Sequence, residues 1–261
     1  MTRPVSHWQN YPEFWSLLAS PLRPCGQDLE IFARELEGGG PALLLGVTGE
    51  IGGLARDGVA IDNSRAMIAE LWPPRPGWRA VQGDWLALPF AAGAFARIVG
   101  DGALSMVRFP ADYRRLFGEL ARVCAGGGKI LLRLFLSPET PEPVEAILGD
   151  LERGAIPNFH ILKWRLAMAL AKGPAGYNVA VAELLALFEE LFPDRERLLR
   201  QTGWRPEVLA TIDVYRSSAV NYSFPPLSAL EEILAGVAGD RRLFYGDYGL
   251  AERCPILLLG R

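Results

Sequence analysis

The segment Ala42–Ile51, which reads ALLLGVTGEI, constrains the fold of this chain more than any other. An apolar run leads into Gly46, and Thr48 and Glu50 follow it closely. This order predicts a buried strand that breaks into a helix at a tight turn, because glycine accepts backbone angles that other residues avoid. Thr48 fits the N-cap of that helix, and Glu50 suits the positive end of its dipole. The turn lets backbone amides approach a ligand.

A second short strand, Val59–Asp62, follows and ends in a carboxylate. A strand, a tight turn, a helix and an acid after the next strand form the nucleotide-binding half of a doubly wound sheet. The acid can accept hydrogen bonds from two ribose hydroxyls. The glycine pattern is incomplete, since only Gly46 stands where a G-x-G-x-G turn requires one. The alternative is an ordinary strand–helix–strand unit that binds nothing.

Strands and helices alternate over residues 42–136. We expect strands at 42–46, 58–62, 80–84, 95–100 and 129–136, and helices at 27–37, 49–56, 64–71 and 112–124. This spacing predicts an α/β fold, a doubly wound and mostly parallel Rossmann-like sheet with helices on both faces.

The character of the chain changes after the fifth expected strand, where prolines form a break. Helices are expected at 143–153, 159–172, 179–201 and 227–236, and strands at 208–217 and 241–261. Four parts follow from this pattern: an N-terminal helical segment or lid at 1–37, a cofactor-binding core at 38–136, a helical insertion that forms a substrate cap at 137–207, and C-terminal strands that complete the sheet at 208–261.

Acidic residues follow three successive strands, at Asp62-Asn63-Ser64, Gly83-Asp84-Trp85 and Gly100-Asp101-Gly102. Open parallel sheets bind ligands at these strand ends. A carboxylate at Asp84 can accept a hydrogen bond from the exocyclic amine of adenine. Trp85 could pack on the ring or belong to the core. Each acid alone would be an ordinary turn former. Together they favour one ligand pocket.

Composition and charge exclude several functions. The net charge of −3 gives no electrostatic reason to bind nucleic acid or an anionic membrane. No apolar run reaches the ~18 residues of a membrane span, and the N-terminus lacks the apolar region of a signal peptide. Cys25, Cys124 and Cys254 form no C-x-x-C pair, which argues against a disulfide framework and a metal site. We expect a soluble, cytoplasmic protein.

The core resembles the class I S-adenosylmethionine-dependent methyltransferases over residues 42–136. The resemblance rests on segments in a fixed order: Leu43-Leu44-Leu45-Gly46, Ile61-Asp62-Asn63-Ser64, Gly83-Asp84-Trp85 with Leu88-Pro89-Phe90, Ile98-Val99-Gly100-Asp101-Gly102, and Glu119-Leu120-Ala121-Arg122-Val123 before Gly126-Gly127-Gly128. It implies S-adenosylmethionine as the cofactor. The implied roles place Gly46 against the methionyl part, Asp62 on the ribose hydroxyls and Asp84 on the adenine amine.

The same resemblance implies a wider binding site. Asp101 and Gly102 would lie near the methionyl group and the substrate. The remaining cofactor-binding candidates are Val47, Thr48, Asn63, Met67, Gly83 and Trp85.

The first turn departs from the family pattern. The usual acid two residues before the first glycine is Leu44 here. The turn is similar to that of a bacterial subgroup of methyltransferase-like proteins, which reads Gly-Val-Thr-Pro-Glu, with Gly49 in place of the proline. The subgroup resemblance extends to Asn158-Phe159-His160 and to Ala251-Glu252-Arg253-Cys254-Pro255.

The resemblance implies methyl transfer to an oxygen or nitrogen of a small molecule. A general base is needed only if the nucleophile must lose a proton. His160 is the histidine of the insertion and a candidate catalytic base, with a packing role as the alternative. Tyr11 and Trp15 could close over the cofactor or pack in the core. Other candidates for lining a substrate cavity are Tyr215, Asn221, Tyr222 and Tyr245.

Two other functions remain open. A non-catalytic binding or partner protein is motivated by the altered glycine turn and by Leu44. A dinucleotide oxidoreductase is a weaker reading, because Gly46–Ile51 does not match the G-x-G-x-x-G turn that binds a pyrophosphate. The oligomeric state and the identity of the acceptor are not predicted.

Overall fold

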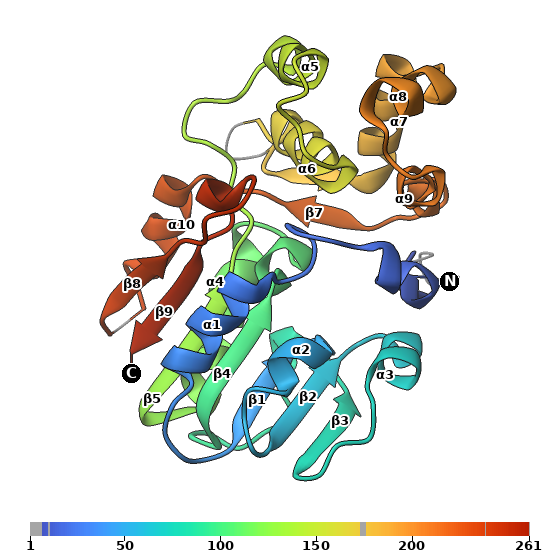
Figure 1. Cartoon of the computed structure of the whole chain (residues 1–261). Coiled ribbons are helices and arrows are strands. Elements are labelled where there is room, and N and C mark those ends of the chain that lie inside the picture. The colour runs from blue at the N-terminus through green and yellow to red at the C-terminus, as the bar shows by residue number, and fades with distance from the viewer. Residues whose placement is uncertain (1–6, 10, 173–175, 238, 261) are drawn as a thin grey trace.

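A computed structural model describes residues 7–9, 11–172, 176–237 and 239–260 (Figure 1). In this part of the chain a seven-stranded sheet has the order β3-β2-β1-β4-β5-β9-β8. The first five strands along the chain pair in parallel, and β9 pairs antiparallel with both β5 and β8. The strands are β1 (Ala42–Leu45), β2 (Gly58–Asp62), β3 (Trp78–Gln82), β4 (Phe95–Asp101), β5 (Cys124–Arg133), β8 (Arg241–Phe244) and β9 (Ile256–Gly260). The predicted fold class is confirmed.

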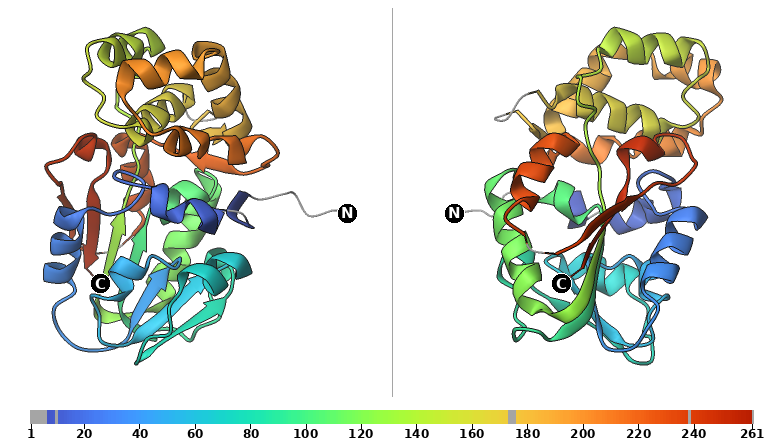
Figure 2. Two further views of the ribbon diagram at one scale, coloured as in Figure 1. Left: turned by 45° about the vertical axis from the view of Figure 1, so that its right-hand side comes forward. Right: turned by 90° about the vertical axis from the view of Figure 1, so that its left-hand side faces the viewer.

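Helices cover both faces of the sheet, so its inner strands are apolar on both sides. In β1, Leu43 packs into one core cluster and Leu44 into the other, and both are fully buried. One face carries α1 (Gly26–Glu35), α2 (Gly49–Gly52) and α3 (Arg65–Leu71); the other carries α4 (Ala111–Val123) and α10 (Leu227–Leu234). The right-hand view of Figure 2 shows α1 and α4 on opposite sides of the sheet.

A second body lies over the carboxyl ends of the strands and is called the cap below (Figures 1 and 2). It consists of α5 (Val144–Glu152), α6 (Phe159–Leu170), α7 (Val181–Leu191), α8 (Arg195–Thr202), α9 (Pro206–Ala210) and the antiparallel strands β6 (Asn178–Ala180) and β7 (Asn221–Ser223). Helix α6 is buried around its whole circumference and forms the centre of a separate core. Across the described ranges, no helix has the length and apolarity needed to cross a bilayer.

The N-terminal segment joins the core to the cap. It contains two 3-10 helices, η1 (His7–Gln9) and η2 (Tyr11–Leu17). Arg23 forms an ion pair with Glu50 at the start of α2, and Asn158 of the cap donates a hydrogen bond to Ser20 O at 3.1 Å. Contacts on both sides therefore hold the segment across the gap between the two bodies.

The strand predicted at 208–217 is wrong. This stretch contains α9 and the 3-10 helix η5 (Asp213–Tyr215). Pro206 at the first helical position and Glu207 in the first turn favour a helix start. Leu209 and Ile212, three residues apart, are buried together, which is a helical spacing.

Other boundaries differ from the prediction by a few residues. The helix expected at 49–56 covers only 49–52, the third strand covers 78–82 rather than 80–84, and the fifth strand covers 124–133 rather than 129–136. The helix expected at 179–201 is a short strand and two helices. Pro193 lies between α7 and α8 and cannot continue the first of them.

Candidate functional site

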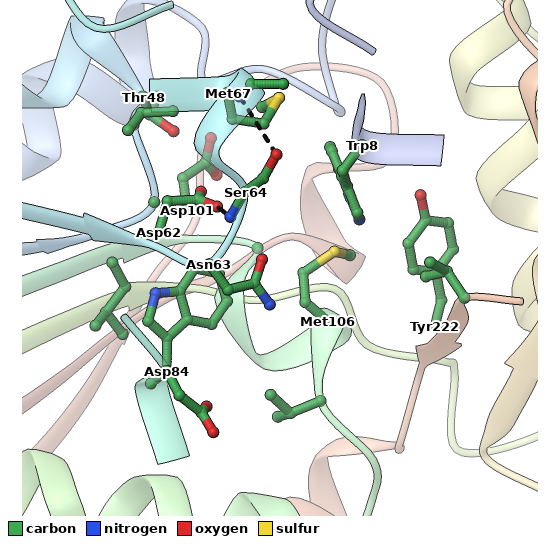
Figure 3. Close-up of a pocket in the computed structure, with 18 of the residues that line it drawn as sticks. Trp8, Thr48, Asp62, Asn63, Ser64, Met67, Asp84, Asp101, Met106 and Tyr222 are labelled. Carbon is green, nitrogen blue, oxygen red and sulfur yellow. Dashed lines mark hydrogen bonds between the residues drawn. The ribbon is translucent and has the colours of Figure 1, made fainter. Parts of the chain in front are cut away.

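A cavity of about 1030 Å³ lies between the strand ends of the core and the cap. Figure 3 shows the strand-end residues of β2 and β4 on one side of it and Tyr222 of the cap on the other. Of the residues expected at the cofactor site, those that line the cavity are Gly46, Val47, Thr48, Asp62, Asn63, Met67, Asp84, Trp85, Asp101 and Gly102. Residues far apart in the sequence thus meet at one opening.

The turn after β1 leaves open space where a side chain would otherwise stand. Gly46 has φ +91°, a left-handed conformation that strains any residue with a Cβ. A Cβ at this position would point between Asp62 and Trp85, with the nearest atom of each 3.9 Å away. Gly46 N donates to Ile61 O at 2.8 Å, which holds the turn against β2. The space beside this turn is a cradle that fits a ligand lying along the backbone.

Asp62 presents a carboxylate to the cavity from the end of β2. Its Oδ1 accepts a hydrogen bond from Ser64 N at 2.7 Å, while its Oδ2 has no hydrogen-bond partner among the described residues. Only 9% of the residue is exposed, and burial raises its pKa to about 6. Ser64 also caps α3 by accepting from Met67 N at 3.3 Å, so the loop that carries the carboxylate is fixed (Figure 3). The free oxygen suits a pair of hydroxyl donors.

Asp84 and Trp85 follow β3 and complete this wall. Asp84 Oδ1 accepts from Leu86 N at 2.9 Å, which leaves the second oxygen of an exposed carboxylate for a ligand. The indole of Trp85 donates to Ile61 O at 2.8 Å, so the ring has one fixed orientation beside the Gly46 turn. An acceptor and a flat apolar surface therefore lie next to each other.

Asp101 ends β4 and belongs to a buried group of three charges. Arg133 is fully buried and donates from Nε to Asp101 Oδ1 at 2.6 Å and from Nη1 to Asp28 Oδ2 at 3.4 Å. Asp28 of α1 also accepts hydrogen bonds from Cys25 N and Tyr248 Oη, both at 3.0 Å. Burial raises the pKa of the Asp101 carboxyl, and Arg133 opposes that shift. Two carboxylates share one guanidinium behind the cavity wall.

The cap side of the cavity is built differently. Met106, Phe135, Trp164, Val220 and Tyr222 line it together with Trp8 of the N-terminal segment. Figure 3 shows Met106 and Trp8 between the Asp62 side and Tyr222. Aromatic rings stack behind this surface, because Trp164 contacts Phe135 and Tyr222 edge-on at centroid distances of 5.4 and 5.3 Å. The apolar half faces the polar strand ends.

A buried polar cluster lies behind Tyr222. The Tyr222 hydroxyl is 3.0 Å from His7 Nε2 and 3.3 Å from the Tyr215 hydroxyl. Lys163 of α6 is fully buried with its ammonium over the rings of Phe159, Trp164 and Tyr215. Burial lowers the pKa of Lys163 to about 7, and burial together with Lys163 lowers the pKa of His7 to about 3.

Two expected site residues do not line the cavity in the described part of the chain. His160 is buried, and its Nε2 donates to Leu17 O at 3.0 Å, between the cap and the N-terminal segment. Burial and Lys163 lower its pKa to about 3, so it is a poor base. Gly83 packs against Ile61, where a Cβ would come within 2.7 Å of Cδ1. The structure therefore supports a packing role for His160 over the catalytic role that the sequence suggested.

The helix start after Gly46 also differs from the expectation. Thr48 occupies the N-cap position of α2, but its side chain makes no capping hydrogen bond. Glu50 pairs with Arg23 of the N-terminal segment. The Glu50–Arg23 pair therefore fixes the start of this four-residue helix to the N-terminal segment.

The sequence predicted some of the residues on the cap side of the cavity. Asn221 and Tyr222 line the cavity and Tyr215 supports Tyr222 from behind, whereas Tyr245 is 50% exposed. Trp15 also lines the cavity, while the side chain of Tyr11 lies outside the described part of the structure. The large apolar and aromatic cavity residues that sequence reasoning missed include Trp8, Met106, Phe135, Trp164 and Val220. Their apolar character gave no signal that separates a cavity wall from a core.

Comparison with known proteins gives one family match. Residues 38–132 match a family described as a methyltransferase domain. No curated protein shows significant similarity to the chain. The matched region covers β1 to β5 except its last residue, and it includes Gly46, Asp62, Asp84 and Asp101.

Solved structures share the fold at low sequence identity. A protein of Rhodobacter sphaeroides, provisionally named a zinc-dependent alcohol dehydrogenase, is 15% identical with a TM-score of 0.59, and the match covers 98% of this chain and 96% of that one. A methyltransferase of Methanosarcina mazei is 14% identical with a TM-score of 0.51, over 92% and 99%. A methyltransferase of Mesorhizobium loti is 15% identical with a TM-score of 0.51, over 89% and 96%. Similarity at this level establishes the fold alone.

The family match supports a methyltransferase domain over residues 38–132 and S-adenosylmethionine as its cofactor. The residues along the cavity wall agree with that cofactor. One wall of the cavity carries the open turn at Gly46, the free carboxylate oxygen of Asp62, and Asp84 beside the fixed indole of Trp85.

Proposed function

We propose that the methyltransferase domain at residues 38–132 binds S-adenosylmethionine in the cavity and that the protein transfers the methyl group to an oxygen or nitrogen of a small molecule under the cap. One observation carries the proposal: Gly46, Asp62 and Asp84 converge on a cavity that also reaches the cap. Its volume of about 1030 Å³ is at the top of the roughly 300–1,000 Å³ of a site for one drug-sized ligand. A second molecule therefore has room.

The residues at the strand ends would hold the cofactor by complementary hydrogen bonds. Asp62 would accept from the ribose hydroxyls, Asp84 from the adenine amine, and the backbone at Gly46 would lie along the methionyl part. The bound cofactor supplies a methyl group already activated by a positively charged sulfur. The main task left to the protein is to position the acceptor and exclude water.

The proposal includes the division of the chain into four parts that the sequence predicts. Residues 1–37 would act as a lid, 38–136 as the cofactor-binding core and 137–207 as the cap that shapes the acceptor site, with 208–261 completing the sheet. Support comes from Trp8, Trp15 and Leu18, which line the cavity from the N-terminal segment. Residues 219–222 also line it, so the C-terminal part contributes to the acceptor side.

A non-catalytic binding protein is the alternative. If helix α6 filled the space beside the strand ends and left no room for an acceptor, the structure would favour this alternative. The cavity is instead open beside the strand ends, and α6 contributes Trp164 to its wall. This arrangement supports the enzyme over the alternative.

Calorimetric titration of the native protein with S-adenosylmethionine and with S-adenosylhomocysteine tests the proposal. We expect one site per chain for each ligand. Absence of heat and of any rise in melting temperature with both ligands would remove the cofactor assignment. Binding of NAD in their place would favour an oxidoreductase.

Replacing Asp84 with Ala is expected to weaken cofactor binding about tenfold. The change removes one hydrogen bond to a carboxylate, worth roughly 1.5 kcal/mol, which corresponds to about a factor of ten. Asp194→Ala is a matched control, because Asp194 caps α8 as Asp84 caps its 3-10 turn and lies outside the cavity. Equal affinities of the two variants for S-adenosylhomocysteine in calorimetry would contradict the role given to Asp84.

A further inference from the structure

We propose that the methyl acceptor is a flat, apolar aromatic molecule with an acidic hydroxyl group, seated between Met106, Trp164 and Tyr222. The inference rests on the proposed function and names the substrate class for its acceptor half. The acceptor half is defined as the part of the cavity wall formed by the N-terminal segment, the chain after β4, the chain after β5 and the cap.

The shape of this half comes from hydrocarbon, aromatic and thioether groups. They include Trp8, Met106, Phe135, Trp164, Val220 and Tyr222. Trp164 is held by three edge-on ring contacts, to Phe135, Tyr222 and Phe224, at centroid distances of 5.3–5.4 Å. A rigid aromatic wall favours a rigid aromatic ligand, because ring stacking and apolar burial then cost little conformational entropy. The thioether of Met106 can adapt to the ligand's outline.

Few polar groups are available to recognise a polar acceptor. Among the described lining residues of the acceptor half, the ionic side chains are Arg108 and Asp112, and Asn221 supplies an amide. Arg108 is exposed, and Asp112 Oδ2 accepts from Arg108 N at 3.2 Å. A sugar or an amino acid would leave most of its polar groups buried without partners, which is unfavourable. An aromatic molecule with one hydroxyl group would bury few polar groups without hydrogen-bond partners.

The acceptor half also lacks a strong base in the described part of the chain. The Tyr222 hydroxyl is bonded to His7, whose imidazole is a weak proton acceptor because burial and Lys163 lower its pKa to about 3. His160 is bonded to Leu17 O and does not line the cavity. The carboxylate that lines the acceptor half, Asp112, already accepts from Arg108 N at 3.2 Å. A nucleophile that is acidic enough to ionise without a strong base therefore suits this site. A phenolic hydroxyl does so with a pKa of about 10, whereas an aliphatic alcohol is far less acidic.

The chemistry balances without another reactant. The phenol loses its proton to solvent, and its oxygen then forms a bond to the methyl carbon. The methyl–sulfur bond breaks, and its electron pair stays on sulfur, which becomes a neutral thioether. At pH 8 roughly one phenol in a hundred is ionised, so the rate is expected to rise about tenfold per pH unit below pH 10.

The test uses 2-naphthol as the aromatic probe and ethanolamine and N-acetylglucosamine as polar probes. We expect 2-naphthol to bind the S-adenosylhomocysteine complex in calorimetry and to release S-adenosylhomocysteine from S-adenosylmethionine, with the stated pH dependence. Val220→Trp fills the acceptor half and is expected to weaken 2-naphthol binding at least tenfold without changing cofactor affinity. Ser217→Trp adds the same bulk at an exposed position outside the cavity and is expected to match the native protein.

Several results would overturn the inference while leaving the cofactor assignment intact. They are binding or turnover of a polar probe in preference to 2-naphthol, no binding of 2-naphthol to the cofactor complex, and equal 2-naphthol affinity of Val220→Trp and Ser217→Trp. Failure of the native protein to bind S-adenosylmethionine is a separate outcome, because it removes the proposed function first.

Discussion

Asp62→Asn is expected to weaken S-adenosylmethionine binding by about 30- to 150-fold and to stabilise the ligand-free protein. The carboxylate ends β2 with one oxygen tied to Ser64 N and the other free of protein partners in the described structure. Asn keeps the acceptor for Ser64 and loses the charge that two ribose hydroxyls would share. Losing charge-assisted hydrogen bonds of this kind costs roughly 2–3 kcal/mol, or about 30- to 150-fold in affinity.

The stability gain follows from the pKa of the same group. Burial raises the pKa of Asp62 from its ordinary value of 3.8 to about 6. The unfolded chain therefore loses this proton at lower pH than the native protein does, and native stability falls as the pH rises from about 4 to about 6. The full cost above pH 6 is on the order of 3 kcal/mol. Asn does not titrate, so its advantage should be small at pH 4 and complete at pH 7.

Two measurements check this prediction. Calorimetry with S-adenosylmethionine at pH 7.5 gives the affinity, and thermal unfolding of the ligand-free protein at pH 4 to 7.5 gives the stability. Asp194→Asn, at an exposed helix cap outside the cavity, is the control for both. Unchanged affinity would exclude Asp62 as the ribose ligand. If Asp62→Asn melted at a lower temperature than the native protein at pH 7, the inference that the buried Asp62 carboxylate destabilises the native protein would be wrong.

The cofactor side of the site was predictable because its signals are local. A strand end, a glycine turn and an acid follow each other within a few residues, and parallel strands then bring Asp62, Asp84 and Asp101 to one edge of the sheet. Gly83 shows the limit of that reasoning. It shares a segment with Asp84 but serves packing against Ile61, and sequence spacing alone does not separate the two roles.

The acceptor side was not predictable because it is assembled from distant parts of the chain. Trp8 and Trp164 come from the N-terminal segment and the cap, and a residue on an apolar helix gives the same pattern whether it faces a core or a cavity. His160 was attractive as a base because of its residue type, yet its environment removes its basicity. Lys163, which lowers the pKa of both histidines, is itself hidden in an apolar helix.

The partner of Asp101 was also hidden from sequence. Arg133 lies within an apolar strand, and Asp28 lies on a helix more than a hundred residues earlier. Their meeting depends on α1 packing over the sheet. The guanidinium pairs with both carboxylates and so supplies the countercharge that two buried acids need.

Arg133→Met is therefore expected to be strongly destabilising. The side chain keeps its apolar length but leaves Asp28 and Asp101 buried without a countercharge. Removing one partner of a buried ion pair costs about 3–5 kcal/mol, which lowers the melting temperature of a chain of this size by roughly 10 °C. The loss should be larger at pH 8 than at pH 5, because burial raises the pKa of Asp101 and Arg133 opposes that shift, so without Arg133 the Asp101 carboxyl is buried at least cost when it is protonated.

Thermal unfolding of purified variants at pH 5 and pH 8 measures the effect. Arg200→Met is the control, since Arg200 is exposed and its pair with Asp194 spans 3.9 Å, so the melting temperature should change little. Adding Asp101→Asn to Arg133→Met removes one of the two unpaired charges and is expected to restore part of the loss at pH 8. If Arg133→Met had the same melting temperature as the native protein at both pH values, the group formed by Asp28, Asp101 and Arg133 would contribute nothing to stability. If the Asp101→Asn addition lowered stability further, the loss would come from packing, not from an unpaired charge.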